Sequence, residues 1–123
     1  MSTSLLKILV VDDCREDRYT YRRFLEQSKD LSYIILETKT GEEGLALARE
    51  ESPTCILLDY RLSDITGLEF ISKFSAYPDA NYTAIIMLTG QGDEVVAVTA
   101  LKDGAMDYLV KGHLTAGALC QTV

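Results

Sequence analysis

Short apolar runs alternate along this chain with segments in which apolar residues recur at helical spacing. Strands buried on both faces read as continuous apolar runs, and the helices that cover them show apolar positions three or four residues apart. Five runs predict strands, at 7–11, 33–37, 55–59, 84–88 and 106–110. Helices are predicted over 15–28, 41–50, 68–74 and 93–103, and a last one from about residue 115. This alternation favours an α/β fold, a doubly wound parallel sheet with helices on both faces.

Signals at the helix ends support these assignments. The segment from Thr40 to Glu43 matches a capping box, in which the Thr40 hydroxyl and the Glu43 carboxylate bond the free amides at the start of a helix. Pro53 ends that helix, and Gly104 is a favourable C-cap for the helix before the last strand.

Four of the predicted strands end on side chains that can bind or react. Asp12 and Asp13 follow the first strand, Asp59 ends the third, Thr89 follows the fourth and Lys111 follows the fifth. Open α/β sheets bind their ligands at the carboxyl ends of the strands. A doubly wound order makes these strands neighbours, so we expect three carboxylates, one hydroxyl and one ammonium in one crevice.

Length and composition are those of an ordinary globular domain. The 123 residues, 47% apolar and 25% charged, fit one compact domain over 1–123 and exclude a disordered chain. The last predicted helix has room for only about nine residues, which suggests a domain excised from a longer multidomain protein. Apolar runs of about five residues are far short of the roughly 20 that span a bilayer, and the N-terminus lacks signal-peptide features. We therefore expect a cytoplasmic location and no membrane partner.

Net charge limits the classes of partner that we expect, and cysteine content limits the kinds of site. A net charge of -7 repels phosphate backbones, which argues against direct nucleic-acid binding and leaves proteins or a hard cation as partners. Cys14, Cys55 and Cys120 form no C-x-x-C pair, so neither a zinc site nor a disulfide framework is predicted. Packed, reduced thiols are the simpler interpretation.

The strand-end residues suit phosphoryl chemistry around a metal. A cluster made only of carboxylate oxygens suits Mg²⁺, which prefers one or two carboxylates together with a phosphate. A carboxylate beside Mg²⁺ can act as a nucleophile toward phosphorus and form an aspartyl phosphate. Lys111 and the Thr89 hydroxyl can then donate to phosphate oxygens, and Gly90 leaves space for the phosphoryl group. No residue resembles an activated general base, so we expect no turnover of a small substrate and no enzyme in the ordinary sense.

In order and spacing, these five residues closely resemble those of the receiver domains of bacterial two-component response regulators, including chemotaxis regulators. The resemblance covers nearly the whole chain and implies a five-stranded sheet of flavodoxin-like order 2-1-3-4-5. It implies that Asp59 accepts a phosphoryl group from a phosphohistidine, so that the domain catalyses only its own phosphorylation and dephosphorylation. It also implies a Mg²⁺ site made of Asp12, Asp13, Asp59 and the backbone carbonyl of Arg61, with Asp12 acting mostly through water.

The resemblance implies a switch and two kinds of partner as well. Thr89 and Tyr108 match the family's switch pair, and Gly67 matches its glycine after the phosphorylation loop. The implied partners are a histidine kinase or phosphotransfer domain and an output domain or protein. The implied output surface is formed by the fourth helix, the fifth strand and the fifth helix.

The chain departs from the family pattern at two places. Gly112 stands where the family usually has a proline in a cis peptide after the lysine. A non-proline cis bond costs about 2.5 to 4 kcal/mol, so the Lys111-Gly112 bond is predicted to be trans or conformationally loose. Ser63 replaces the usual loop proline. Arg61 and Gln91 occupy the two variable positions that tune the lifetime of the phosphoryl group in the family, so that lifetime does not follow from the residue types.

These residues allow three other interpretations. A Mg²⁺-dependent phosphohydrolase of the haloacid dehalogenase type also uses a strand-end aspartate as its nucleophile. Such an enzyme requires a second acid two residues later, where this chain has Arg61. A phosphate-independent interaction module with the same fold is conceivable because the proline is missing. The pair Asp12-Asp13 could also simply cap the following helix. The presence of all five signature residues favours the receiver.

Overall fold

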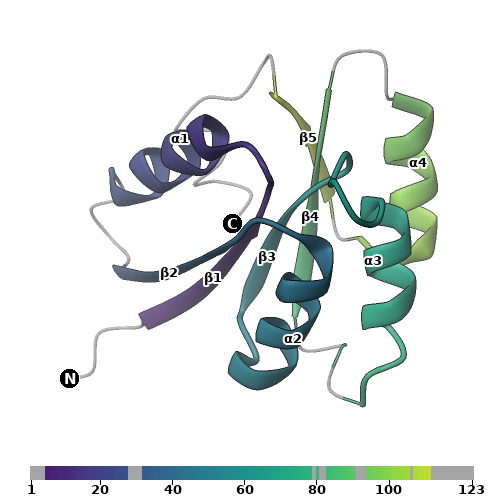
Figure 1. Cartoon of the computed structure of the whole chain (residues 1–123), viewed down its shortest axis with the longest axis horizontal. Helices are drawn as coiled ribbons and strands as arrows, with labels where there is room; N and C mark the ends of the chain where they lie inside the picture. The colour runs from purple at the N-terminus through teal and green to yellow at the C-terminus, as the bar shows by residue number, and fades with distance from the viewer. Residues whose placement is uncertain are drawn as a thin grey trace.

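The fold is a single parallel sheet with helices on both of its faces. The computed structural model describes residues 5–27, 32–78, 80, 83–90, 94–105 and 107–111 (Figure 1). The strands are β1 (Leu5–Val11), β2 (Ser32–Thr38), β3 (Cys55–Asp59), β4 (Ala84–Thr89) and β5 (Asp107–Val110). They pair in parallel in the order β2-β1-β3-β4-β5, which confirms the predicted order.

Four described helices cover the sheet: α1 (Arg15–Glu26), α2 (Gly41–Glu51), α3 (Gly67–Phe74) and α4 (Glu94–Asp103). Figure 1 shows α1 on one face and α2, α3 and α4 on the other. The helix predicted from about residue 115 lies outside the described residues. No helix in the described ranges has the length and apolar character needed to cross a membrane.

Two apolar layers, one on each face of the sheet, make up the core. Alternate residues of the central strands point to opposite faces, and both sets are buried. One layer packs under α2, α3 and α4 and contains Leu9, Val11, Ile56, Leu58, Met87, Phe70 and Ile71. The other packs under α1 and contains Ile8, Val10, Leu57, Ile86, Leu88, Tyr21 and Leu25. Burial on both faces explains why the central strands read as unbroken apolar runs.

The start of α2 differs in part from the predicted capping box. The Thr40 hydroxyl accepts a hydrogen bond from the Glu43 amide at 3.1 Å, as predicted. The Glu43 carboxylate, however, accepts from the Thr40 hydroxyl, and the carboxylate of Asp64 accepts from the amides of Gly41 and Glu42 at 2.8 and 2.9 Å. Asp64 therefore ties the loop after β3 to the first turn of α2.

A complete capping box is found at α3 instead, where the sequence analysis did not predict one. The Glu69 amide donates to the Thr66 hydroxyl, and the Thr66 amide donates to the Glu69 carboxylate, both at 3.1 Å. This reciprocal pair fixes the helix that begins directly after the loop. The loop after β3 is thus held at both ends.

Candidate functional site

The predicted strand-end residues meet at the carboxyl edge of the sheet. Asp12 directly follows β1, Asp59 ends β3, Thr89 ends β4 and Lys111 follows β5, so the parallel register brings them to one edge. Asp12, Asp13 and Asp59 each offer a carboxylate oxygen, and these oxygens lie within 4.8 Å of one another. The convergence expected from the sequence is present.

Asp12 is fully buried and held by four neighbours. Its carboxylate accepts from the Cys14 amide at 2.9 Å, the Tyr21 hydroxyl at 3.4 Å and the Lys111 ammonium at 3.0 Å. Burial raises the pKa of Tyr21, so the phenol keeps its proton and stays a donor to Asp12. The backbone carbonyl of Asp12 accepts from the Arg18 guanidinium at 2.7 Å. These contacts fix the turn between β1 and α1, while Asp13 next to it is exposed.

Lys111 lies among three carboxylates. Its ammonium is 2.8 Å from Asp17, 3.0 Å from Asp12 and 3.1 Å from Asp59. Burial by itself would lower the pKa of Lys111, but the hydrogen bond to Asp17 and the surrounding negative charges outweigh it and raise the pKa. The lysine is therefore a permanent cation at neutral pH.

Asp17 is a site residue that the sequence analysis missed. It lies in the first turn of α1, one helical turn before the buried Tyr21, so both side chains lie on the side of α1 that covers the sheet. That spacing was the available signal. It could not be interpreted without knowing that β5 lies on the same edge as β1 and delivers Lys111 to α1.

Asp59 is nearly buried, with 5% of its surface exposed. Burial raises its pKa to about 6, with a further increase from the charge of Asp12 and an opposing decrease from Lys111. The Arg61 amide donates to its carboxylate at 3.4 Å. At neutral pH Asp59 is thus an anion in a site where anions are disfavoured, and an added cation would stabilise it.

The raised pKa of Asp59 gives a pH-dependent stability prediction for the metal-free protein. The folded state binds this proton up to about pH 6, whereas the unfolded chain releases it near its ordinary value of 3.8. The contribution of Asp59 to stability therefore decreases as the pH rises from about 4 to 6, and Asp59→Asn removes this penalty. Above pH 6.5 we expect the variant to be more stable than wild type by about 1 to 2 kcal/mol, after allowance for solvent screening.

Urea unfolding in EDTA across pH 4 to 8 measures this difference. The difference in the free energy of unfolding between variant and wild type should grow between pH 4 and 6 and stay constant above pH 6. A difference in the free energy of unfolding that is the same at every pH would contradict the assignment of the raised pKa to Asp59.

The donor set fits a divalent cation such as Mg²⁺. The candidate ligands are carboxylate oxygens, which hard cations prefer, and three carboxylates share this edge. Arg61, the fourth predicted contributor, lies two residues beyond Asp59 in a loop held by an antiparallel bridge between Arg61 and Thr66. A backbone group in this loop is therefore at a fixed place beside the carboxylates.

Thr89 is fully buried, and its hydroxyl has no hydrogen-bond partner among the residues that the structure describes. A buried polar group without a partner carries a desolvation cost, and such groups in native proteins call for an explanation. Its strand partner is Val110, and two residues earlier Met87 pairs with Tyr108, so Thr89 and Tyr108 lie on the same face of the sheet. Tyr108 packs against the core layer that α4 covers.

Close packing explains the glycine at position 67. A methyl group added to Gly67 would lie 2.9 Å from the side chain of Met87 and 3.0 Å from the backbone of Tyr60. The Gly67 amide also donates to the Tyr60 carbonyl at 2.8 Å, which closes the loop. A larger residue would therefore displace the loop that follows Asp59.

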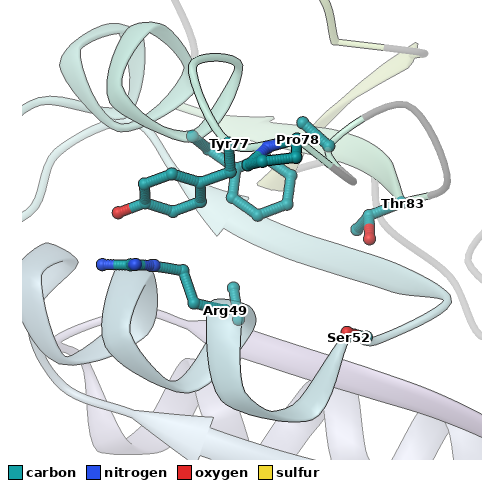
Figure 2. A pocket seen from close by; sticks show the side chains of 8 residues that line it. Arg49, Ser52, Tyr77, Pro78 and Thr83 are labelled. Atoms are coloured by element: carbon teal, nitrogen blue, oxygen red, sulfur yellow. The ribbon is translucent and has the colours of Figure 1, made fainter.

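A separate hollow of about 100 Å³ lies at the opposite edge of the sheet (Figure 2). On one side of the hollow, the Arg49 guanidinium lies 4.7 Å over the ring of Tyr77. Ser52 and Thr83 line the other side of the hollow. Ser52 and Thr83 come just before β3 and β4, at their amino ends. None of the predicted site residues lines this hollow.

Two sequence features lie outside the described residues: Gln91, and the peptide between Lys111 and Gly112. The geometry predicted for that peptide stays a prediction.

Comparison with known proteins agrees with this arrangement. The family model of the response regulator receiver domain matches residues 8–123. The chain belongs to this family. The transcriptional regulatory protein SrrA of Staphylococcus aureus is 37% identical to this receiver domain over 105 residues, which are 85% of the chain and 41% of SrrA. The chain thus spans well under half the length of this curated relative.

Solved structures of other receiver domains share the fold. The chemotaxis protein CheY4 of Vibrio cholerae is 26% identical, with a TM-score of 0.84 and coverage of 97% of this chain and 96% of that chain. A response regulator receiver domain protein from Clostridium thermocellum is 29% identical, with a TM-score of 0.82 and coverage of 94% and 89%. Both match nearly the whole length of this receiver domain.

Proposed function

We propose that this receiver domain is a phosphoacceptor switch in which Asp59 takes a phosphoryl group from the phosphohistidine of a histidine kinase or phosphotransfer domain. The observation that carries the proposal is the position of the Asp59 carboxylate. It is nearly buried at a strand end, 3.1 Å from the Lys111 ammonium and within 4.8 Å of oxygens of Asp12 and Asp13.

Each residue has a separate part in the transfer. A carboxylate oxygen of Asp59 forms a bond to phosphorus while the bond from phosphorus to the donor's imidazole nitrogen breaks. The electron pair of that bond stays on the nitrogen, which takes up a proton from water. The Lys111 ammonium donates to an oxygen of the transferred group. The Thr89 hydroxyl, buried and without a described partner, donates to another.

Asp12, Asp13, Asp59 and the backbone carbonyl of Arg61 would hold Mg²⁺, with Asp12 acting mostly through water. When bound, Mg²⁺ offsets the negative charge that builds up on the phosphoryl oxygens. The need for such a cation follows from the charges, since three carboxylates share this edge and the ammonium of Lys111 contacts only Asp12 and Asp59 among them.

Phosphorylation would be converted into a signal through Thr89 and Tyr108. Phosphate adds about -1.5 to -2 charges to an acidic pocket, and Thr89 moves toward it while Tyr108 turns inward. The output surface comprises α4, β5 and the helix predicted from about residue 115. Its α4 part exposes Val95, Val98 and Leu101, an apolar patch suited to a protein partner.

The phosphate alone is expected to shift the switch only partly. Carrying an equilibrium from 1:99 to 99:1 needs about 5.5 kcal/mol of preference for the active state. One ammonium contact and one hydroxyl contact supply less than that. The output partner therefore completes the transition by binding the active form.

Labelling with a small phosphodonor tests the proposal. Acetyl phosphate with Mg²⁺ should add one phosphoryl group per chain, seen as a single shift in intact mass, and EDTA should abolish it. Because the domain acts only on itself, p-nitrophenyl phosphate should not be turned over steadily. Continuous turnover without a covalent label would instead identify a phosphohydrolase and overturn the proposal.

A further inference from the structure

The ammonium of Lys111 lies within ion-pair distance of three carboxylates and donates hydrogen bonds to two of them, Asp12 and Asp17. The shortest of the three contacts is to Asp17 at 2.8 Å, followed by Asp12 at 3.0 Å and Asp59 at 3.1 Å. An ammonium has three N–H groups and no other hydrogen-bonding capacity. Two of these N–H groups are already used, so a phosphoryl oxygen that binds this ammonium must compete with the carboxylates that hold it.

Asp17 differs from the other two carboxylates. Asp12 and Asp59 belong to the group of acids whose oxygens could hold a metal, and Asp17 does not. Asp17 comes from α1, and its side chain is 37% exposed, whereas the side chains of Asp12 and Asp59 are 0% and 8% exposed. Its ion pair with Lys111 links α1 to the end of β5.

The charges of the site change at Asp12 and Asp59 when the domain reacts, but not at Asp17. A bound cation shares the charge of Asp12, and esterification removes the charge of Asp59. Asp17 keeps its full charge and its contact, so it continues to neutralise Lys111 and to repel the incoming phosphate. Its effect opposes phosphoryl capture.

From this geometry we propose that Asp17 is a positioning residue that slows phosphorylation of Asp59 by holding Lys111 on the α1 side of the site. The inference rests on the proposed function, because it assumes that Lys111 serves the phosphoryl group. Among the described residues, Asp17 shares no hydrogen bond or ion pair with Asp12, Asp13 or Asp59, and it acts through Lys111. The residue at position 17 thereby sets the rate at which Asp59 is phosphorylated.

The labelling rate of Asp17→Asn with acetyl phosphate and Mg²⁺ tests this inference. Asn has the same shape but no charge, so the variant should be labelled faster than wild type by a factor of about 1.5 to 5, the range expected for a partly exposed ion pair. Asp17→Ala, which also removes the contact, should be faster as well. A damaged fold cannot produce an increase in rate, so the direction separates this role from a structural one.

Glu16→Gln is the matched control. Glu16 lies in the same first turn of α1 and carries the same charge, but its described side-chain hydrogen bond is to the Cys14 thiol at 3.4 Å. This variant should be labelled at the wild-type rate. A second control is the Lys111→Met background, in which adding Asp17→Asn should give no acceleration.

The two proposals fail in different ways. An unchanged or slower rate in Asp17→Asn, with wild type labelled normally, overturns the role of Asp17 alone. An equal acceleration in Glu16→Gln also overturns it, because the effect would then be one of general charge. Absence of any label on wild type overturns the proposed function itself.

Discussion

Replacing Lys111 with Met is expected to destabilise the metal-free domain by about 2 to 4 kcal/mol, because breaking a buried ion pair leaves uncompensated charge behind. Lys111 is the cation between Asp12, which is fully buried, and Asp59, which is 5% exposed. Urea unfolding in EDTA measures the loss. Because a bound cation compensates the same carboxylates, Mg²⁺ should restore more stability to the variant than it adds to wild type.

The same substitution should slow labelling by acetyl phosphate roughly 10²- to 10³-fold, which is the typical loss when a donor aimed at developing charge is removed. Lys7→Met is the matched control, since Lys7 pairs with Glu51 at 3.0 Å with both side chains about one-third exposed. That variant should lose less than about 1 kcal/mol and keep its labelling rate. If Lys111→Met were as stable as wild type without metal, the charge balance described for the site would be wrong.

Asp59→Asn is expected to lose the covalent label altogether, a decrease of at least about 10³-fold in the phosphorylated fraction, because a neutral amide is not a nucleophile of the carboxylate kind. Intact mass after treatment with acetyl phosphate and Mg²⁺ measures it. The fold should survive, since the raised pKa of Asp59 shows that its charge is disfavoured in the folded state.

Asp64→Asn is the matched control for this variant. Asp64 belongs to the same loop, but its carboxylate caps the amides of Gly41 and Glu42 at the start of α2. The control should gain one phosphoryl group, as wild type does. Equal labelling of wild type and Asp59→Asn would show that another residue is the acceptor.

Much of the fold follows from local patterns that act over a few residues. The runs at 55–59 and 84–88 are apolar on both faces because helices cover both faces, and this pattern predicts central parallel strands. The positions of Asp59, Thr89 and Lys111 then follow, since each is the polar residue that directly follows an apolar run at a strand end. Nearly every element boundary in the described ranges lies within two residues of the prediction.

Contacts between side chains from distant elements could not be predicted in the same way. The sequence around Asp17 offers two adjacent acids, and only the packing of α1 beside Lys111 selects one of them. The capping of α2 by Asp64 likewise depends on how the loop after β3 folds back over Gly41. Such contacts are set by tertiary geometry, and local propensity carries no information about them.

The most direct test of the account is to locate the phosphoryl group on the wild-type chain. After labelling with acetyl phosphate and Mg²⁺, borohydride reduction converts an acyl phosphate to a stable alcohol, and peptide mass spectrometry then identifies the modified residue. We expect modification of the peptide that contains Asp59, at that residue alone. A phosphoryl group on any other residue, or none under saturating phosphodonor, would contradict it.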